Sequence, residues 1–333
     1  MAVISVDGLT KDYGEVVAND DLSFEVDAGE VFGYLGPNGA GKTTTIRMLM
    51  GFQSPTAGTA TVLGQDVRDE RALRTAKAEM GYLPGNPSFD GSVTGQEFLD
   101  YQAALKGDER REELLELFDP PLDRKIREYS TGNRQMLGIV QAFMHDPDLV
   151  VMDEPTSGLD PLKQSRFNAF LREERDRGVT VFFSSHVLSE VQRVCDRVAI
   201  IRNGSLVALE DVSDLLGRGG KHVDLHVGGS VDRAAFDIEG VTDLAVFDGG
   251  VQFTYTGEYD ALLELVSSYE VLDLTIEDPP LDELFLRFYG DETESNATPD
   301  PGVARSDDDR DDGGDADAAP ESDATEGSGE PRA

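Results

Sequence analysis

One stretch of the sequence decides the fold: Val31-Phe32-Gly33-Tyr34-Leu35-Gly36-Pro37-Asn38-Gly39-Ala40-Gly41-Lys42-Thr43. Its first five residues have the apolar character of a buried strand, and a helical run over 44–50 follows it. The segment between them matches G-x-x-x-x-G-K-[ST], in which glycines let backbone N–H groups converge on phosphate oxygens without a Cβ in the way. The N-terminus of the following helix adds a favourable dipole for an anion. The stretch therefore predicts a phosphate-binding loop between a strand and a helix.

Nine consecutive residues are expected to contact a nucleotide: Gly36, Pro37, Asn38, Gly39, Ala40, Gly41, Lys42, Thr43 and Thr44. Lys42 would reach the β- and γ-phosphates, and the Thr43 hydroxyl would ligate Mg²⁺. The alternative is a glycine-rich turn with a solvated lysine. A chance match to this pattern in a chain of 333 residues is on the order of one in a hundred, which favours the nucleotide site.

An acidic pair follows another apolar run, Leu149-Val150-Val151-Met152. Asp153 would emerge at the carboxyl end of this strand, where it can hold Mg²⁺ through water, and Glu154 can polarise an attacking water. Taken alone, such a pair usually marks a strand end that meets solvent. A third apolar run at 180–183 is also followed by polar residues, so three strand ends are expected to point at one crevice.

The charge balance is strongly acidic, because 66 Asp and Glu against 29 Lys and Arg give a formal charge of −37. This excess argues against nucleic acid or an anionic membrane surface as a partner. Only seven of the basic residues are Lys. An acid-rich, lysine-poor balance predicts a surface adapted to concentrated salt, as in a halophile, where ions screen the self-repulsion.

Cysteine usage and hydropathy bear on where the chain works. The single cysteine, Cys195, excludes an internal disulfide framework and a four-cysteine zinc site, as expected in a reducing compartment. No stretch approaches ~18 consecutive apolar residues, and the N-terminus lacks the basic and apolar regions of a secretion signal. We therefore expect a cytoplasmic protein that does not span a membrane.

Composition and periodicity divide the chain into three parts. Residues 1–216 alternate strand runs with amphipathic stretches, which predicts an α/β domain, and its helical subdomain at about 90–145 contains a capping box of Thr94 and Glu97. Residues 221–290 predict a small α+β module and 291–333 an acidic, disordered tail. The module's expected elements are strands around 223–227, 251–255 and 272–276 and helices at 259–266 and 281–289.

The chain resembles the ABC ATPases through several motifs that stand in the family's order. The segment Tyr129-Ser130-Thr131-Gly132-Asn133-Arg134-Gln135 resembles their LSGGQ signature, and Ser157-Gly158-Leu159-Asp160 resembles their D-loop. His186 is placed like the switch histidine, and Tyr13 is placed like the aromatic residue that stacks on adenine. The resemblance covers roughly residues 3–215 and includes the phosphate loop.

This resemblance implies a P-loop NTPase fold that hydrolyses ATP with Mg²⁺, with Glu154 and His186 as catalytic residues. It also implies a head-to-tail homodimer, in which Ser130 and Gly132 of one copy meet the γ-phosphate held by the other, with Asp160 at the same site. The further partner would be an integral-membrane permease that docks on the helical subdomain. The chain would then work at the cytoplasmic face of the cell membrane.

Two further segments resemble the ATP-binding subunits of drug-, lipid- and polysaccharide-type exporters, the daunorubicin-resistance-like branch: Gly81-Tyr82-Leu83-Pro84 and Asp278-Pro279-Pro280-Leu281-Asp282-Glu283-Leu284-Phe285-Leu286. That likeness implies export. The sequence departs from the family pattern at Gly85, where most members have Gln or Glu, and in the signature. There, Tyr129, Thr131 and Asn133 replace Leu, Gly and Gln. Because Ser130 and Gly132 are kept, dimerisation on ATP is still expected.

Two other functions fit the residues less well. A soluble ABC ATPase of translation or DNA repair typically fuses two cassettes, inserts a long coiled coil or adds zinc-binding cysteines, whereas this sequence has one cassette and one cysteine. An unrelated P-loop kinase or GTPase would not require Ser130, Gly132 or His186. The sequence therefore favours a transporter subunit, and it does not identify the cargo, because cargo contacts the permease.

Overall fold

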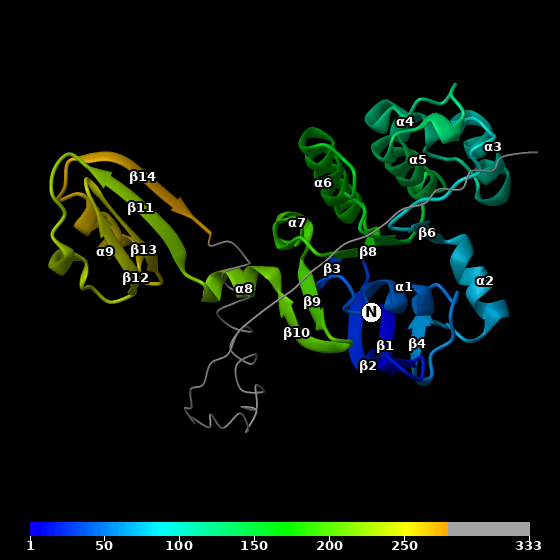
Figure 1. Ribbon diagram of the computed structural model, residues 1–333, viewed down its shortest axis with the longest axis horizontal. Helices are drawn as coiled ribbons and strands as arrows, with labels where there is room; N and C mark the ends of the chain where they lie inside the picture. Colours follow the sequence, from blue (N-terminus) through cyan, green and yellow to red (C-terminus); the bar gives the residue numbers. More distant parts are fainter. Residues whose placement is uncertain (279–333) are drawn as a thin grey trace, which may run out of the picture. The chain divides into compact units, whose positions relative to one another are not determined.

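A six-stranded sheet with the order β10-β9-β3-β8-β7-β6 forms the centre of the N-terminal part of the chain (Figure 1). The computed structural model describes residues 1–278, apart from the side chains of 217 and 218. Its strands are β3 (Val31–Leu35), β6 (Met80–Leu83), β7 (Leu149–Asp153), β8 (Thr180–Ser185), β9 (Arg197–Arg202) and β10 (Ser205–Asp211). All neighbours pair in parallel except β9 and β10. The three apolar runs expected from the sequence are therefore adjacent strands, β3, β8 and β7.

Alternate residues of the central strands face two different apolar cores, as expected for strands that are buried on both sides. Val150 and Met152 of β7 pack with helices α5 (Thr131–Phe143), α6 (Pro161–Asp176) and α7 (Leu188–Val194). Leu149 and Val151 face the opposite core, which includes residues of α1 (Lys42–Leu49). Figure 1 shows these helices on the two sides of the sheet.

A second, antiparallel sheet that was not predicted from the sequence closes the α1 side. It has the order β2-β1-β4-β5 and consists of β1 (Ala2–Asp12), β2 (Val17–Asp27), β4 (Ala57–Val62) and β5 (Gln65–Asp66). Phe24 of β2 lies 5.8 Å from Phe32 and 6.2 Å from Phe182, measured between ring centroids. These aromatic contacts join the antiparallel sheet to the central one.

The predicted helical subdomain is built around α3 (Gly95–Lys106), α4 (Arg111–Phe118) and α5, with a single 3₁₀ turn at Ile126–Glu128. Helix α2 (Glu70–Ala78) precedes β6. The predicted capping box is present: the Thr94 hydroxyl accepts a hydrogen bond from the backbone N–H of Glu97, and the Glu97 carboxylate accepts one from the N–H of Thr94. Two orphan amides at the start of α3 are thereby satisfied.

Residues 221–278 contain a four-stranded antiparallel sheet with the order β12-β13-β11-β14. Its elements follow α8 (Val212–Arg218) and are β11 (Lys221–Val227), a 3₁₀ turn (Arg233–Phe236), β12 (Val241–Phe247), β13 (Gly250–Tyr255), α9 (Tyr259–Val266) and β14 (Val271–Glu277). The three predicted strands and the predicted helix at 259–266 are present, and β12 was not predicted. The expected helix at 281–289 and the expected tail at 291–333 lie outside the described residues. The three-part domain division stays a prediction.

Within residues 1–278, no helix is both long enough and apolar enough to cross a bilayer.

Candidate functional site

The predicted phosphate loop connects β3 to α1 and lines a cavity of about 460 Å³. Eight of the nine predicted loop residues, 37–44, line it, together with residues 16–18, Glu154, Asn203 and Gly204. Gly36 does not line the cavity, because it packs beneath the loop, where a Cβ would lie 2.4 Å from the Ile201 carbonyl oxygen. Gly41 has a φ of +108°, and a Cβ there would lie 2.3 Å from the Ala18 oxygen. Both positions therefore require glycine.

Lys42 is largely buried, with 6% of its surface exposed, and its ammonium group lies at the loop. Its Nζ donates hydrogen bonds to the carbonyl oxygens of Gly36 at 2.6 Å and Pro37 at 3.2 Å. The same Nζ lies 3.4 Å from Oε1 of Glu154. A buried cation beside a loop that leads into the N-terminus of a helix is suited to a polyphosphate.

Thr43, Asp153 and Ser184 form a hydrogen-bonded group at the adjoining ends of β7 and β8. The Thr43 hydroxyl donates to Oδ2 of Asp153 at 2.8 Å, and the Ser184 hydroxyl donates to Oδ1 at 2.5 Å. A hydroxyl and a carboxylate are hard oxygen donors, the kind that Mg²⁺ prefers. Among residues 1–278, no group of three His, Cys, Asp or Glu side chains is placed to hold a metal alone. The donor set therefore fits an ion that completes its shell with nucleotide phosphates and water.

Glu154 directly follows β7 and adopts a left-handed backbone conformation, with a φ of +51°. Its N–H donates to the Ser184 carbonyl at 3.1 Å and to the Ser184 hydroxyl at 3.2 Å, and these contacts hold the unusual turn. Oε2 of Glu154 lies 2.5 Å from Nδ1 of His186, and the side chain lines the loop cavity. The structure thus brings Lys42, Glu154 and His186 together, and their catalytic and binding roles stay predictions.

The signature and D-loop residues contact each other rather than the phosphate loop. Ser130 caps α5, because its hydroxyl accepts a hydrogen bond from the N–H of Asn133 at 3.2 Å. Gly132 packs against Gly158, where a Cβ would lie 2.8 Å from the Gly158 oxygen. Asp160 caps α6, and the hydrogen bond from the Lys163 N–H lowers the pKa of the Asp160 carboxyl. Ser130, Gly132 and Asp160 are absent from the residues that line the chain's own loop cavity.

Tyr13 lies in the hairpin between β1 and β2, where its N–H donates to the carbonyl oxygen of Val16. Val16 lines the loop cavity, whereas Tyr13 itself does not. The Tyr13 ring is 54% exposed, and the Lys11 amine lies 5.3 Å from its centre. Its hydroxyl is hydrogen-bonded to Gln53. The structure therefore leaves Tyr13 outside the cavity lining, and its contact with a base stays a prediction.

Two polar side chains at the site, Ser184 and Gln135, make contacts that were not predicted. Ser184 holds both Asp153 and Glu154, and the polar pair that follows the apolar run at 180–183 is the signal that could have found it. Gln135, fully buried, donates to the Pro155 carbonyl at 2.7 Å and ties α5 to the residues after Glu154.

At Gly85, a Cβ would lie 3.1 Å from the Asp153 carbonyl oxygen and 3.4 Å from its Oδ2. A side chain at this position would therefore point at the Asp153 carboxylate.

The chain is similar in sequence and in fold to known proteins. A family model described as "ABC transporter" matches residues 19–157. An uncharacterized ABC transporter ATP-binding protein of Synechocystis is 33% identical over 80% of this chain and 77% of its own length. The Nod factor export ATP-binding protein I of Mesorhizobium japonicum is 33% identical over 88% of this chain and 89% of its own. A solved ATP-binding subunit of an ABC transporter superposes with a TM-score of 0.60 at 30% identity, covering 65% of this chain and 92% of that one.

Proposed function

Because this chain belongs to the family of ABC transporter ATP-binding proteins, which are ATPases, we propose that it powers export through a membrane permease. The ATP-binding and ATP-hydrolysing activity follows from the family. The permease, the direction of transport, the requirement for Mg²⁺ and the roles of individual residues are our proposals. Export is supported by the relative from Mesorhizobium japonicum, whose name states that it takes part in Nod factor export.

The single observation that carries the mechanism is the convergence of Lys42, Glu154 and His186 at the phosphate loop. Loop amides and the Lys42 ammonium bind the β- and γ-phosphates, and Thr43 with Asp153 would hold Mg²⁺. The chemistry that Mg²⁺ would supply there is positive charge that offsets the negative charge of the phosphates. Glu154 then orients a water for in-line attack on the γ-phosphorus and accepts its proton, while the bond from the γ-phosphorus to the bridging oxygen breaks and ADP leaves. His186 holds the Glu154 carboxylate in place.

A second copy of the chain completes the site. Ser130, Gly132 and Asp160 do not line their own loop cavity, so in one chain they are unused by the nucleotide. The N-terminus of α5, with the Ser130 hydroxyl and the backbone amide of Gly132, offers donors suited to a phosphate. We therefore assign these residues to the γ-phosphate held by the other protomer of a head-to-tail homodimer, with 1–216 as the ATPase domain.

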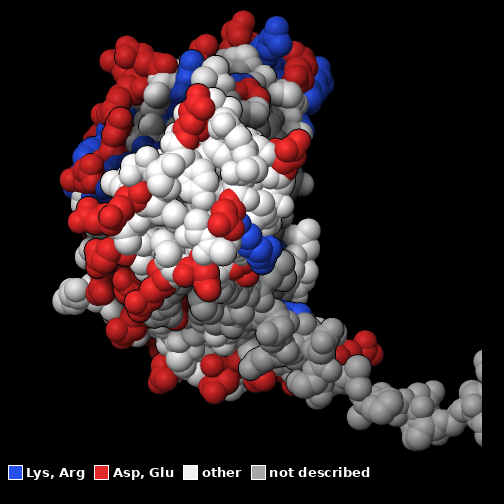
Figure 2. All heavy atoms as spheres, turned by 90° about the vertical axis from the view of Figure 1, so that its left-hand side faces the viewer, with Lys and Arg blue, Asp and Glu red and all other residues white. Residues whose placement is uncertain are grey.

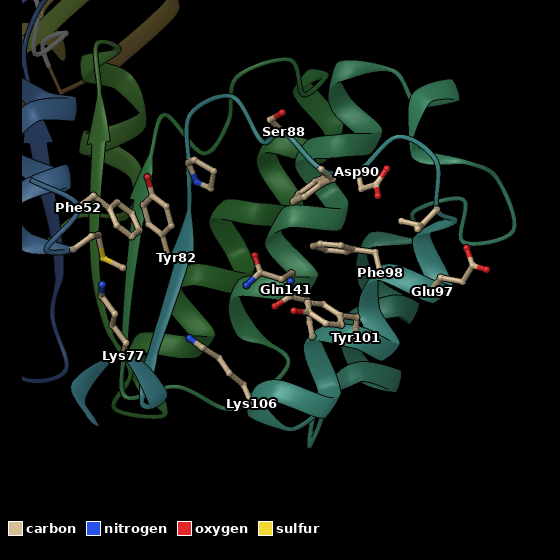
Figure 3. A pocket seen from close by; sticks show the side chains of 15 residues that line it. Phe52, Lys77, Tyr82, Ser88, Asp90, Glu97, Phe98, Tyr101, Lys106 and Gln141 are labelled. Carbon is tan, nitrogen blue, oxygen red and sulfur yellow. The ribbon is translucent and has the colours of Figure 1, made fainter. Parts of the chain in front are cut away.

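The permease is expected to dock in a groove between α3 and the end of β6. This groove has a volume of about 750 Å³ and is lined largely by aromatic and aliphatic side chains, among them Phe52, Tyr82, Phe98 and Tyr101 (Figure 3). Tyr101 is 62% exposed although it lines an apolar cavity. Such a groove suits one face of a short amphipathic helix, because apolar anchors fill its pockets.

The charged side chains at the groove indicate which end of the permease helix lies at which side of the groove. Lys77 and Lys106 line one side, and Asp90 and Glu97 line the opposite side (Figure 3). Burial lowers the pKa of both lysines, and for Lys106 the nearby Lys77 adds to the effect, so an acidic partner group would be favoured there. A helix carries partial negative charge at its C-terminus. We propose that the permease segment places its C-terminal or acidic end at Lys77 and Lys106.

Exchange of Tyr101 for aspartate tests this docking. In membranes that contain the cognate permease, Tyr101→Asp should lower permease-stimulated ATPase activity at least about tenfold, because a charge in an apolar groove costs binding energy. Basal activity of the isolated chain should stay unchanged. Leu105→Asp is the matched control, since Leu105 is equally exposed on the same helix but does not line the groove. Equal effects of both variants on stimulated activity would contradict docking here.

We further propose that the chain is held at the cytoplasmic face of the membrane by the permease. We also propose that its surface is adapted to high salt. On the face drawn in Figure 2, acidic side chains are more prominent than basic ones. A formal charge of −37 makes self-repulsion large at low ionic strength. The same charge disfavours nucleic acid as a partner.

A further inference from the structure

The two loops that carry Glu154 and His186 are joined by a carboxylate that lies outside the nucleotide cavity. Glu190 belongs to α7 and accepts two hydrogen bonds, one at each oxygen. Its Oε1 accepts from the Thr156 hydroxyl at 2.5 Å, and its Oε2 accepts from the Ser185 hydroxyl at 2.8 Å. Thr156 and Ser185 are both buried. One side chain therefore bridges the end of β7 to the end of β8.

Each hydroxyl lies close in sequence to a proposed catalytic residue. Thr156 is two residues after Glu154, and its carbonyl accepts the N–H of Leu159, which closes the turn toward the D-loop. Ser185 immediately precedes His186, and its hydroxyl also accepts the N–H of Val187 at 2.9 Å. Movement of either hydroxyl relative to Glu190 would change the position of Glu154 relative to His186.

We propose that Glu190 is a positioning residue that holds Glu154 and His186 in register for hydrolysis. A carboxylate accepts hydrogen bonds at both oxygens without donating any, so it can hold two hydroxyls at once. Val191 and Val194 are buried in the core and hold α7 in place, so the Glu190 side chain is not needed to anchor the helix. Catalytic groups must be held within about 0.5 Å of their working positions. Hydrogen bonds such as those of Glu190 can hold them there.

This inference rests on the proposed roles of Glu154 and His186, and it makes a distinct prediction. Glu190→Ala should lower kcat by on the order of 10- to 100-fold, because small misplacements of reacting groups have effects of this size. The KM for ATP should change less than about twofold, because Glu190 is not among the residues that line the loop cavity. Glu190→Gln should recover most of the activity, because its amide oxygen accepts from one hydroxyl and its amide N–H donates to the other.

The experiment measures steady-state kcat, the KM for ATP and amide hydrogen exchange for the full chain. In Glu190→Ala, amides at 156–159 and 185–188 should exchange faster, while those of the β3 strand stay protected. The matched control is Glu173→Ala, which removes an exposed glutamate from α6. Thr156→Val removes one of the two hydroxyls without shortening the side chain, and it should lower kcat in part. Combined with Glu190→Ala, it should add little further loss.

Each of the following results would overturn the proposal. Glu190→Ala could keep kcat within about twofold of the wild type. Glu190→Gln could lose as much activity as Glu190→Ala, which would mean that charge rather than the two hydrogen bonds matters. The double variant Thr156→Val/Glu190→Ala could lose as much activity as the two single losses combined. If Glu190→Ala does not fold, an unchanged kcat in Thr156→Val would overturn it as well. Failure of the Glu154 role would instead show as residual hydrolysis in Glu154→Gln.

Discussion

Exchange of Glu154 for glutamine should stop hydrolysis while ATP still binds. Glutamine keeps the shape of the side chain and the two backbone contacts to Ser184, but it cannot take a proton from water. A positioned general base contributes roughly 10²- to 10⁴-fold, and at about 1.4 kcal/mol for each factor of ten the barrier should rise by roughly 3–5 kcal/mol.

The same exchange should change stability little. It weakens the contact between Glu154 and Lys42, whose charged atoms lie 3.4 Å apart, but Lys42 keeps the carbonyl oxygens of Gly36 and Pro37. Glu154 is only partly buried, so we expect a loss of about 1 kcal/mol or less in the free energy of unfolding. A loss of activity at constant stability would separate a chemical role from a structural one.

The assay is single-turnover hydrolysis with Mg-ATP, combined with light scattering to follow dimer formation. Without hydrolysis to reopen it, the ATP-bound dimer of Glu154→Gln should accumulate. Lys42→Ala supplies the opposite control, because loss of the buried ammonium should prevent ATP binding and dimerisation. Glu116→Gln on α4 is a charge-matched control at an exposed position. Hydrolysis by Glu154→Gln within a few-fold of the wild type would refute the reasoning and make His186 the first candidate to position the water.

Two predictions concern stability. The melting temperature and the ATPase rate should rise from 0.1 M to 1 M KCl, because the Debye length falls from about 10 Å to about 3 Å and −37 charges repel less; an unchanged melting temperature would count against salt adaptation. Burial first, and Lys106 second, lower the pKa of His145, so the fold favours its neutral form and the free energy of unfolding should decline as the pH falls below the unfolded value of about 6.5. His145→Gln, whose amide can still donate to the Met80 carbonyl, should flatten this decline in melting curves between pH 7.5 and 5.5; an equal slope in both proteins would show that other groups cause it.

The elements predicted from sequence share one property, which is a strong local signal. Strands β3, β7 and β8 are continuous apolar runs because the sheet is covered on both faces. Strand β2 has the alternation of a half-buried strand at Leu22, Phe24 and Val26, so this signal was present although it was not used. Strand β12 has no buried residue among 241–247, and periodicity could not have found it.

The candidate site also contains residues that the sequence indicates and residues that it does not. Lys42 and Thr43 follow from a contiguous motif, and their placement at the start of α1 agrees with it. The contacts of Ser184 and Glu190 depend on which residue of β8 lies opposite which residue of β7, and the register places Asp153 beside Ser184. Register between strands about thirty residues apart is set by packing over the whole sheet. The sequence therefore indicated the reacting groups and not the side chains that hold them.

The left-handed turn at Glu154 connects the nucleotide site to the helix that Ser130 caps. Its φ of +51° is uncommon outside glycine and is held by Ser184, whose hydroxyl also binds Asp153. The next residue, Pro155, is held by Gln135 of the helix that Ser130 caps. A rotation of that helix would therefore act on the backbone next to the proposed base. Gln141 of the same helix lines the proposed permease groove, and Ser130 at its start belongs to the proposed dimer contact, so both proposals place a partner on a helix that is hydrogen-bonded to this turn.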